Sequence, residues 1–375
     1  MKKISLLRPF IGKEEVNAVA KTLLSGWITL GPKTQEFEEK FATYVGAPYA
    51  IGLTSATAGL HIALKVVGVK KGDEVITTPI TFASTVEAIL YNDATPVFAD
   101  VEESTLNMDP ASVEKRITKK TKAILVVHYA GQPCDMDKIN AIARKYKLKV
   151  IEDAAHACGA SYGGKKIGGS GNITCFSFHA VKNLATGDGG MITTFDQKIM
   201  KELRLLRWMG IDKSTYQREG SKGYSWDYDI AVGGYKYHMN DITASIGIVQ
   251  LKKLDAMNKK RSQIRKVYDS FFSKNNIGTA LVLKPGRLSS HHLYVVKLQK
   301  GISRPSFMAY LAEKGISTGV HYKPAYHHPR YKKFNKKNTP VAEANWSAIV
   351  SLPMHPGMSL ADAKLVVSTI KNFKK

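Results

Sequence analysis

The chain has 375 residues, which is enough for a large core and for two domains. Hydrophobic residues make up 44% of it, and the absence of a run of about 18 apolar residues predicts no membrane-spanning helix. The N-terminal apolar stretch is too short for a secretory signal, and three widely spaced cysteines make neither a disulfide framework nor a zinc motif. We therefore expect a globular cytoplasmic protein with no membrane partner and no metal site.

The charge is strongly basic, with a formal net value of +24 from 55 basic and 31 acidic residues. The basic residues are mostly lysines that lie in pairs along the whole chain, whereas a nucleic-acid module more often gathers arginine and lysine on one face with aromatic residues between them. We interpret the charge as a lysine-rich surface and expect no nucleic-acid partner. Such a surface also attracts anionic small molecules.

The N-terminal part predicts two helices, over residues 13–25 and 33–46, joined by a loop of glycine, proline and aromatic or apolar residues. A short strand over 50–54 then runs into a helix that opens with the small, hydroxylated residues 55–59. Free backbone N–H groups and the positive end of the helix dipole make this turn a candidate anion cradle. An ordinary serine N-cap explains the same residues.

From residue 74 the chain alternates between strands and helices, which predicts parallel strands joined by crossover helices. Binding residues should then lie at the carboxyl ends of strands, where Ser55, His128 and Asp153 lie. The glycine-rich stretch 159–173 fits no phosphate-loop spacing and predicts a hairpin with turns. The predicted strands are 74–78, 95–100, 123–127 and 148–153, and the predicted helices are 82–91, 109–116 and 136–146.

The second half predicts a different arrangement. A loop over 210–234 is long enough to be functional or to contact another subunit, and a long helix over 242–275 leaves the first domain. We expect a large α/β domain over 1–245 and a smaller α+β domain over 246–375. Further predicted elements are helices over 197–209, 304–314 and 359–372 and strands over 191–195, 292–298 and 316–321.

One lysine stands out by its context. Lys182 follows the apolar, aromatic run 175–178 and precedes the glycine-rich turn 187–190, so its side chain should end in a partly dry pocket. Desolvation lowers the pKa of an ammonium group and makes the amine a nucleophile, which is what a Schiff-base lysine requires.

Four features in chain order match the needs of a pyridoxal phosphate (PLP) enzyme: the cradle at 55–59, Asp153, Ser177 and Lys182. The cofactor needs a phosphate cup, an acid against its pyridinium nitrogen and a lysine for the Schiff base. A freed Lys182 could also move a proton between the substrate carbon and the cofactor. Asp153 taken alone is equally explained as a strand-end acid that caps a helix.

The sequence resembles the DegT/DnrJ/EryC1/StrS sugar-nucleotide aminotransferases, which are fold type I PLP enzymes. The resemblance covers nearly the whole chain and implies an aminotransferase-like fold with a mostly parallel sheet. The motifs that carry it are 25–32, 54–60, 81–85, 152–157, 177–182, 187–190, 239–244, 320–324 and 351–353.

The resemblance also implies roles for single residues. Lys182 would form the Schiff base with PLP, Asp153 would pair with the ring nitrogen, His156 would lie near the ring's 3-oxygen and Phe82 would stack on the ring face. The residues that would hold the phosphate are Ala56, Thr57 and Ser177.

Two positions depart from the family pattern. Relatives complete the phosphate cup with an Asn from the partner subunit, and Lys236 stands at that position here, while His238 replaces the usual Arg. Lys236 could still meet a phosphate as a cation. The residues that would border the sugar-nucleotide pocket are Thr29, His321 and Tyr322.

The resemblance thus implies a homodimeric aminotransferase with shared active sites. L-glutamate would donate the amine and leave as 2-oxoglutarate, and a nucleotide-linked keto-sugar would accept it, at C4 of a 4-keto-6-deoxy sugar. The product would be an amino sugar for a lipopolysaccharide, another surface polysaccharide or a glycan. Two alternatives stay open: a PLP-dependent nucleotide-sugar dehydratase, in which relatives replace the catalytic lysine by histidine, and a non-catalytic basic regulatory protein on the same fold.

Overall fold

The centre of the protein is a seven-stranded sheet in a computed structural model that describes residues 3–213, 215–218, 226–334 and 339–374. Its strand order is β1-β9-β8-β5-β4-β2-β3. The pairs β2–β3, β2–β4, β4–β5 and β5–β8 are parallel, as the alternating pattern predicts. The strands are β1 (Tyr49–Leu53), β2 (Glu74–Thr77), β3 (Thr95–Phe98), β4 (Thr121–Val127), β5 (Lys149–Asp153), β8 (Ile173–Ser177) and β9 (Gly190–Thr194).

Strand β9 runs antiparallel to both of its neighbours, β8 and β1. The chain between β8 and β9 contains no crossover helix, and a direct turn places the next strand antiparallel. This turn carries Lys182. The departure from parallel pairing therefore falls at the residue around which the predicted site is built.

Helices cover both faces of the sheet. Successive side chains of β8 point to opposite faces, and the side chains on both faces are buried. Cys175 belongs to a core with Leu60 and Ile62 of α3, whereas Phe176 packs against Phe41 of α2, with ring centroids 5.0 Å apart. The helices of this part are α2 (Pro32–Val45), α3 (Ala56–Val66), α4 (Ala83–Leu90), α5 (Pro110–Lys115), α6 (Met136–Lys145) and α7 (Gln197–Arg207).

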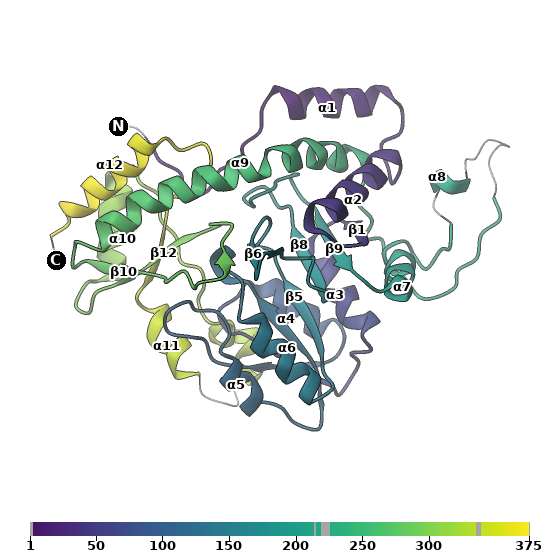
Figure 1. Ribbon diagram of the computed structural model, residues 1–375, viewed down its shortest axis with the longest axis horizontal. Helices are drawn as coiled ribbons and strands as arrows, with labels where there is room; N and C mark the ends of the chain where they lie inside the picture. The colour runs from purple at the N-terminus through teal and green to yellow at the C-terminus, as the bar shows by residue number, and fades with distance from the viewer. Residues whose placement is uncertain (1–2, 214, 219–225, 335–338, 375) are drawn as a thin grey trace.

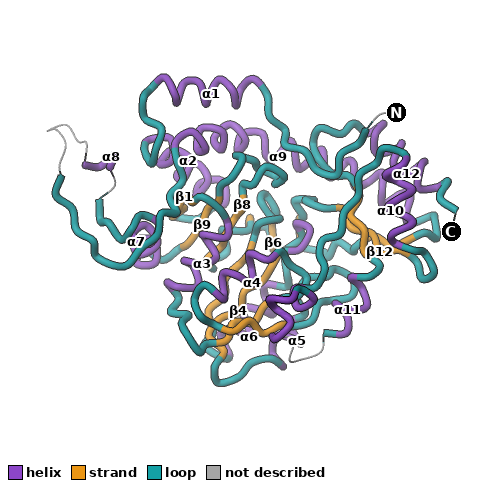
Figure 2. Tube along the Cα trace, turned by 180° about the vertical axis from the view of Figure 1, so that it is seen from behind, coloured by secondary structure: helices purple, strands orange, loops and turns teal. Residues whose placement is uncertain are grey.

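A long helix, α9 (Asp241–Phe272), runs along one side of the molecule and leads into the C-terminal part (Figure 1). The N-terminal helix α1 (Lys13–Leu24) lies along its first half, as Figures 1 and 2 both show. Asp241 starts the helix, is buried, and accepts hydrogen bonds from the backbone N–H groups of Gly31 and Thr34. The start of α9 is therefore bonded to the start of α2.

The C-terminal part has its own three-stranded sheet, β10 (Gly278–Ala280), β12 (Tyr294–Leu298) and β13 (Ile349–Leu352). The hairpin predicted within 159–173 is confirmed as β6 (Ser161–Tyr162) and β7 (Lys165–Lys166), and β11 (Arg287–Leu288) pairs with β6. This pairing joins the two parts of the chain, and the predicted boundary between 245 and 246 stays a prediction. The helices here are α10 (Arg304–Glu313), α11 (Pro340–Trp346) and α12 (Leu360–Lys371).

The strand predicted over 316–321 is wrong. Ile316 and Gly319 form only isolated bridges, with Ile4 and Ser351 respectively, because the segment passes from one neighbour to another instead of following one strand. The loop predicted over 210–234 contains a short helix, α8 (Thr215–Arg218), and residues 214 and 219–225 of it lie outside the described residues. No helix in the described ranges is long and apolar enough to cross a membrane.

Candidate active site

Lys182 lies in a turn that folds back on itself between β8 and β9. Its backbone N–H donates to the carbonyl oxygen of His179 (2.8 Å), and the N–H of Phe178 donates to that of Gly189 (2.8 Å). The side chain is half-buried. Burial lowers the pKa of its ammonium group to about 8, although the charge of Asp153 acts in the opposite direction. The desolvation expected from the sequence is therefore present.

Asp153 ends β5 and is buried. One carboxylate oxygen accepts from the N–H of Ala155 (3.1 Å) and the other from the hydroxyl of Thr85 (2.8 Å). Burial raises the pKa of this carboxyl group, while Thr85, Ala155 and the charge of Lys182 partly oppose the rise. Thr85 is a site residue that the sequence reasoning missed, although it lies in the family motif 81–85 that could have found it.

The predicted anion cradle is formed by the first turn of α3. Ser55 caps the helix and accepts from the N–H of Ala58 (3.1 Å), which leaves the N–H groups of Ala56 and Thr57 without helical partners. Gly190, at the start of β9, lies so close that an added Cβ would be 2.6 Å from the nitrogen of Ala56. The backbone of β9 thus borders the cradle directly. The cap interpretation is confirmed, because Ser55 caps the helix, and the anion cradle stays a prediction.

Ser177 ends β8 and is buried. Its Oγ accepts a long hydrogen bond from the N–H of His179 (3.4 Å), so its own hydroxyl proton is left to donate. The hydroxyl of Thr57 instead donates to Ser84 (2.7 Å). Of the two predicted phosphate hydroxyls, Ser177 is the one free to donate to an anion.

His156 and Tyr322 meet at the site from the two parts of the chain. The Tyr322 hydroxyl lies 3.1 Å from Nε2 of His156, and their rings are stacked at 22°. Nδ1 of His156 is buried without a hydrogen-bond partner in the described part of the chain. Burial lowers the pKa of His156 well below its ordinary value, and Lys182 and His321 add to the effect. The His156 ring is therefore neutral, and Nδ1 can still bond to a ligand.

Two further predicted residues flank Tyr322. Phe82, the N-cap of α4, is 62% exposed, and its ring centroid lies 6.2 Å from that of Tyr322. Nδ1 of His321 lies 2.8 Å from the hydroxyl of Ser351, and the carbonyl oxygen of His321 accepts from the Tyr129 hydroxyl. Lys182 interacts electrostatically with His321 as well. The C-terminal part thus contributes His321 and Tyr322 to the surroundings of Lys182.

Thr29 and Lys236 are not brought to Lys182. Thr29 is exposed, and its carbonyl oxygen accepts from the N–H of Asp241 (2.9 Å). The ammonium group of Lys236 lies 4.0 Å from the ring centroid of Trp208, and His238 packs edge-on against the same ring at 4.3 Å. Their predicted roles, Thr29 toward the substrate and Lys236 toward the partner subunit, stay predictions.

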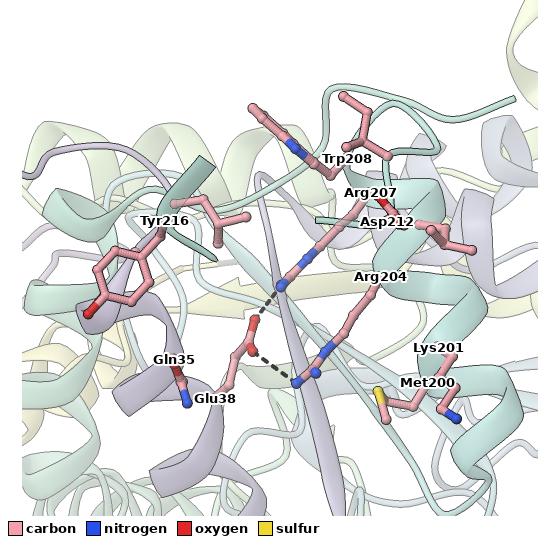
Figure 3. A pocket seen from close by; sticks show the side chains of 13 residues that line it. Gln35, Glu38, Met200, Lys201, Arg204, Arg207, Trp208, Asp212 and Tyr216 are labelled. Carbon is pink, nitrogen blue, oxygen red and sulfur yellow. Dashed lines mark hydrogen bonds and ion pairs between the residues drawn. The ribbon is translucent and has the colours of Figure 1, made fainter. Parts of the chain in front are cut away.

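A cavity of about 430 Å³ lies between α2 and α7 and is separate from this site (Figure 3). Figure 3 shows Glu38 between Arg204 and Arg207, both of which form ion pairs with it. Neither Lys182 nor Asp153 lines this cavity. We therefore place the chemistry at the carboxyl ends of the central strands β5 and β8, next to the first turn of α3.

The residues at these strand ends fit PLP. The orphaned Nδ1 of His156, the free N–H groups at the start of α3 and the Ser177 hydroxyl are the partners that ring substituents and a phosphate require. Asp153 is a buried acid that interacts electrostatically with Lys182, and burial lowers the pKa of the Lys182 ammonium group to about 8.

Comparison with known proteins identifies the family. Residues 9–371 match the DegT/DnrJ/EryC1/StrS aminotransferase family. The spore coat polysaccharide biosynthesis protein SpsC of Bacillus subtilis is 43% identical over 375 residues, which is 98% of this chain and 96% of SpsC.

Two solved structures extend the likeness to the fold. A Streptococcus pneumoniae protein assigned as a sugar aminotransferase, solved in its PLP form, has a TM-score of 0.91 at 34% identity, over 99% of this chain and 98% of that one. Helicobacter pylori PseC, an aminotransferase involved in the biosynthesis of pseudoaminic acid, has a TM-score of 0.92 at 30% identity, over 99% and 98% of the two chains. The chain therefore belongs to the DegT/DnrJ/EryC1/StrS aminotransferase family, and it is a PLP-dependent sugar aminotransferase with the α/β fold of fold type I.

Proposed function

We propose that the enzyme transfers the amino group of L-glutamate to a nucleotide-linked keto-sugar, at C4 of a 4-keto-6-deoxy sugar. The reaction balances as glutamate plus keto-sugar giving 2-oxoglutarate plus amino sugar. The observation that carries the proposal is the half-buried Lys182, whose pKa is about 8 and which interacts electrostatically with the buried Asp153. An amine of this basicity can both accept and return a proton near neutral pH.

Each residue has a defined task in this proposal. Bound PLP supplies an electron sink for the substrate carbon that loses its proton. Asp153 would keep a proton on the ring nitrogen, Ser177 and the first turn of α3 would hold the phosphate, and Lys182 would move the proton at the substrate carbon. Hydrogen bonds from Thr85 and Ala155 fix the orientation of the Asp153 carboxylate.

The sugar class is supported by the relatives and by the charge of the chain. SpsC is named for the biosynthesis of spore coat polysaccharide, and PseC acts in the biosynthesis of pseudoaminic acid. A formal net charge of +24 would favour the encounter with a nucleotide diphosphate. We assign Thr29, His321 and Tyr322 to the substrate pocket and the product to a surface polysaccharide or glycan made from cytoplasmic precursors.

We also propose a homodimer. Large apolar side chains are exposed near the segment of Lys236, among them Trp226 (78% exposed) and Ile230 (68%). Burial of such side chains against a second copy is favourable. Lys236 would then lie near the phosphate of the partner's cofactor, as a cation in place of the family's Asn.

A mass-spectrometric screen tests the function. Purified enzyme with PLP and glutamate is offered 4-keto and 3-keto sugars linked to UDP, dTDP or GDP. We expect an amino-sugar mass and an equal amount of 2-oxoglutarate from a 4-keto-6-deoxy sugar, and neither product from Lys182→Ala. A deoxy keto-sugar would instead indicate the dehydratase, and turnover by Lys182→Ala would overturn the proposal.

A further inference from the structure

A buried amide lies directly behind the lysine. Asn183 follows Lys182 in the turn between β8 and β9 and is only 2% exposed. Its Nδ2 donates to the carbonyl oxygen of Ser290 (2.8 Å) and to Oδ1 of Asn258 (2.7 Å). Its Oδ1 lies 2.8 Å from Nδ1 of His292. One side chain thus joins the lysine turn to α9 and to the segment before β12.

Backbone carbonyl groups fix the direction of this network, because a carbonyl oxygen can only accept. Nδ2 of Asn258 donates to the carbonyl oxygen of Cys158 (3.0 Å), so its Oδ1 is the atom that faces Asn183. Asn183 must in turn present Nδ2 to the carbonyl oxygen of Ser290. Only its Oδ1 is then left for His292, and the proton between them must be on Nδ1 of the imidazole.

Cations and other imidazoles surround His292, and within the described residues no carboxylate is bonded to its ring. The ring lies 4.3 Å from that of His156, centroid to centroid. Burial lowers the pKa of His292 well below its ordinary value, and the groups that add to this effect are His156, Lys182, Arg261 and His321. Asn183 accepts the Nδ1 proton without adding a negative charge that would draw a second proton to the ring.

A second contact ties the same segment to His156. The Ser290 hydroxyl donates to the carbonyl oxygen of His156 (2.5 Å). Gly131 leaves space for the Ser290 side chain, because a Cβ added to Gly131 would lie 2.3 Å from Oγ of Ser290 and 3.0 Å from the backbone nitrogen of His292. The φ of Gly131 is +97°, a conformation that favours glycine. His156 and His292 are therefore held together by backbone contacts as well as by their rings.

We infer that Asn183 is a positioning residue, which ties the Lys182 turn to residues 290–292 and holds His292 as the neutral Nδ1–H tautomer against His156. The inference rests on the proposed function, because the positions of Lys182 and His156 affect turnover only if PLP and substrate bind there. A neutral His292 adds no positive charge near the lysine, with which it interacts electrostatically. Asn183 acts through Lys182 and His292 and needs no contact with substrate.

The first test reads the state of the imidazole in the full-length protein labelled with ¹⁵N-histidine. In the wild type we expect His292 to show the neutral Nδ1–H tautomer from pH 6 to 8, with and without PLP. Asn183→Asp keeps an acceptor but adds a charge, so His292 should become protonated at pH 7. Asn183→Ala removes the acceptor and should give a mixture of tautomers. An unchanged His292 signal in both variants would overturn the inference.

The second test separates positioning from general stability. We expect Asn183→Ala to lower kcat by about tenfold to a hundredfold, the scale expected when a reacting group is misplaced, with a much smaller change in KM. The matched control is Asn92→Ala, because Asn92 is also buried and donates to two backbone carbonyl groups, those of His61 (3.1 Å) and Ala88 (2.9 Å). It should lose stability yet keep the wild-type kcat and His292 signal.

The two proposals fail in different ways. If the wild type aminates no keto-sugar but His292 shows the expected tautomer, the proposed function is wrong and the network stands. If the wild type turns over and Asn183→Ala keeps its kcat, or if Asn92→Ala lowers kcat equally, the positioning role is wrong. Asn183→Asp keeps the test valid if Asn183→Ala fails to fold.

Discussion

At the scale of single residues, Lys182 combines a chemical advantage with a cost in stability. Burial lowers the pKa of its ammonium group from the ordinary value of 10.5 to about 8. The unfolded chain therefore binds more protons than the folded one between these two values. By linkage, the free energy of unfolding of the cofactor-free protein rises with pH across this window, and the full penalty is present below pH 8.

The first prediction follows from this rise of the free energy of unfolding with pH. In the absence of PLP, Lys182→Met should be more stable than the wild type by about 3 kcal/mol at pH 7, since each pKa unit corresponds to about 1.4 kcal/mol. The difference should vanish near pH 10.5, where both states of the wild type lose the proton. Urea unfolding at several pH values measures it. Lys165→Met, at an exposed lysine of β7, is the control, and a pH-independent difference for Lys182→Met would contradict the prediction.

The second prediction concerns Thr85, whose hydroxyl donates to Asp153 and lowers its pKa. Thr85→Val should raise the pKa of Asp153 further and weaken its hold on the ring nitrogen. We expect the Kd for PLP to rise by about tenfold or more, since a hydrogen bond to a charged group contributes about 1.5–3 kcal/mol. Equilibrium dialysis measures the Kd.

Two variants complete this experiment. Thr85→Ser keeps a hydroxyl and should recover most of the PLP affinity. Thr22→Val removes another buried hydroxyl, which donates to the carbonyl oxygen of Ala18 within α1, and it should leave the Kd unchanged. If Thr85→Val binds PLP with the wild-type Kd, the hydrogen bond from Thr85 to Asp153 does not contribute to PLP binding.

At the scale of elements, local patterns predicted most of the framework. The alternation of strands and helices between residues 74 and 153 has a strong local signal, and the structure agrees with it. The segment 316–321 was predicted as one strand, but its backbone bonds first to Ile4 and then to Ser351. Such partners are far away in the sequence, so no local pattern can reveal them.

The same limit applies to the site. Lys182, Asp153 and Ser177 lie in motifs of the family, so the sequence alone could propose them as site residues. Asn183 bonds to Ser290, 107 residues further along the chain, so its role required the fold. Thr85 was within reach, because it belongs to a motif that the sequence already showed, but nothing local relates it to Asp153.

The third prediction tests how β9 borders the cradle at α3. In Gly190→Ala, the new Cβ would lie 2.4 Å from the carbonyl carbon of Ser55 and 2.6 Å from the nitrogen of Ala56. These are backbone atoms, so the first turn of α3 must move, and the phosphate contacts move with it. We expect a loss of about 1–3 kcal/mol in stability and at least a tenfold rise in the Kd for PLP.

Gly12→Ala is the control for this change. An added Cβ there meets only Oε2 of Glu15, at an ordinary contact distance of 3.8 Å, and its φ of −140° is extended. Gly12 is the N-cap of α1, so the change should lower stability by about 1 kcal/mol and leave the PLP affinity near its wild-type value. If Gly190→Ala keeps the PLP affinity as Gly12→Ala does, the cradle tolerates displacement and β9 does not define it.

At the scale of the whole molecule, a few buried polar contacts hold distant segments together. Arg207, at the end of α7, forms a buried ion pair with Glu38 of α2 and donates to the carbonyl oxygen of Gly52 in β1 (3.0 Å). The N–H of Gly52 donates to Glu38 in return (2.8 Å). Three elements therefore meet at one pair of charges, next to the cavity of Figure 3.

The fourth prediction concerns the loss of one partner from the Glu38–Arg207 ion pair, which leaves the other charge buried and unpaired. Arg207→Met should lower the free energy of unfolding by about 3–5 kcal/mol, because it leaves the Glu38 carboxylate buried with too few partners. Arg204 also faces Glu38, at 3.8 Å, but its side chain is 50% exposed, so Arg204→Met should cost less than about 1 kcal/mol. Adding Glu38→Gln to Arg207→Met removes the unpaired charge and should restore part of the loss. Urea unfolding with an unchanged m-value measures all three variants, and equal losses for Arg207→Met and Arg204→Met would show that burial of the pair has no such effect.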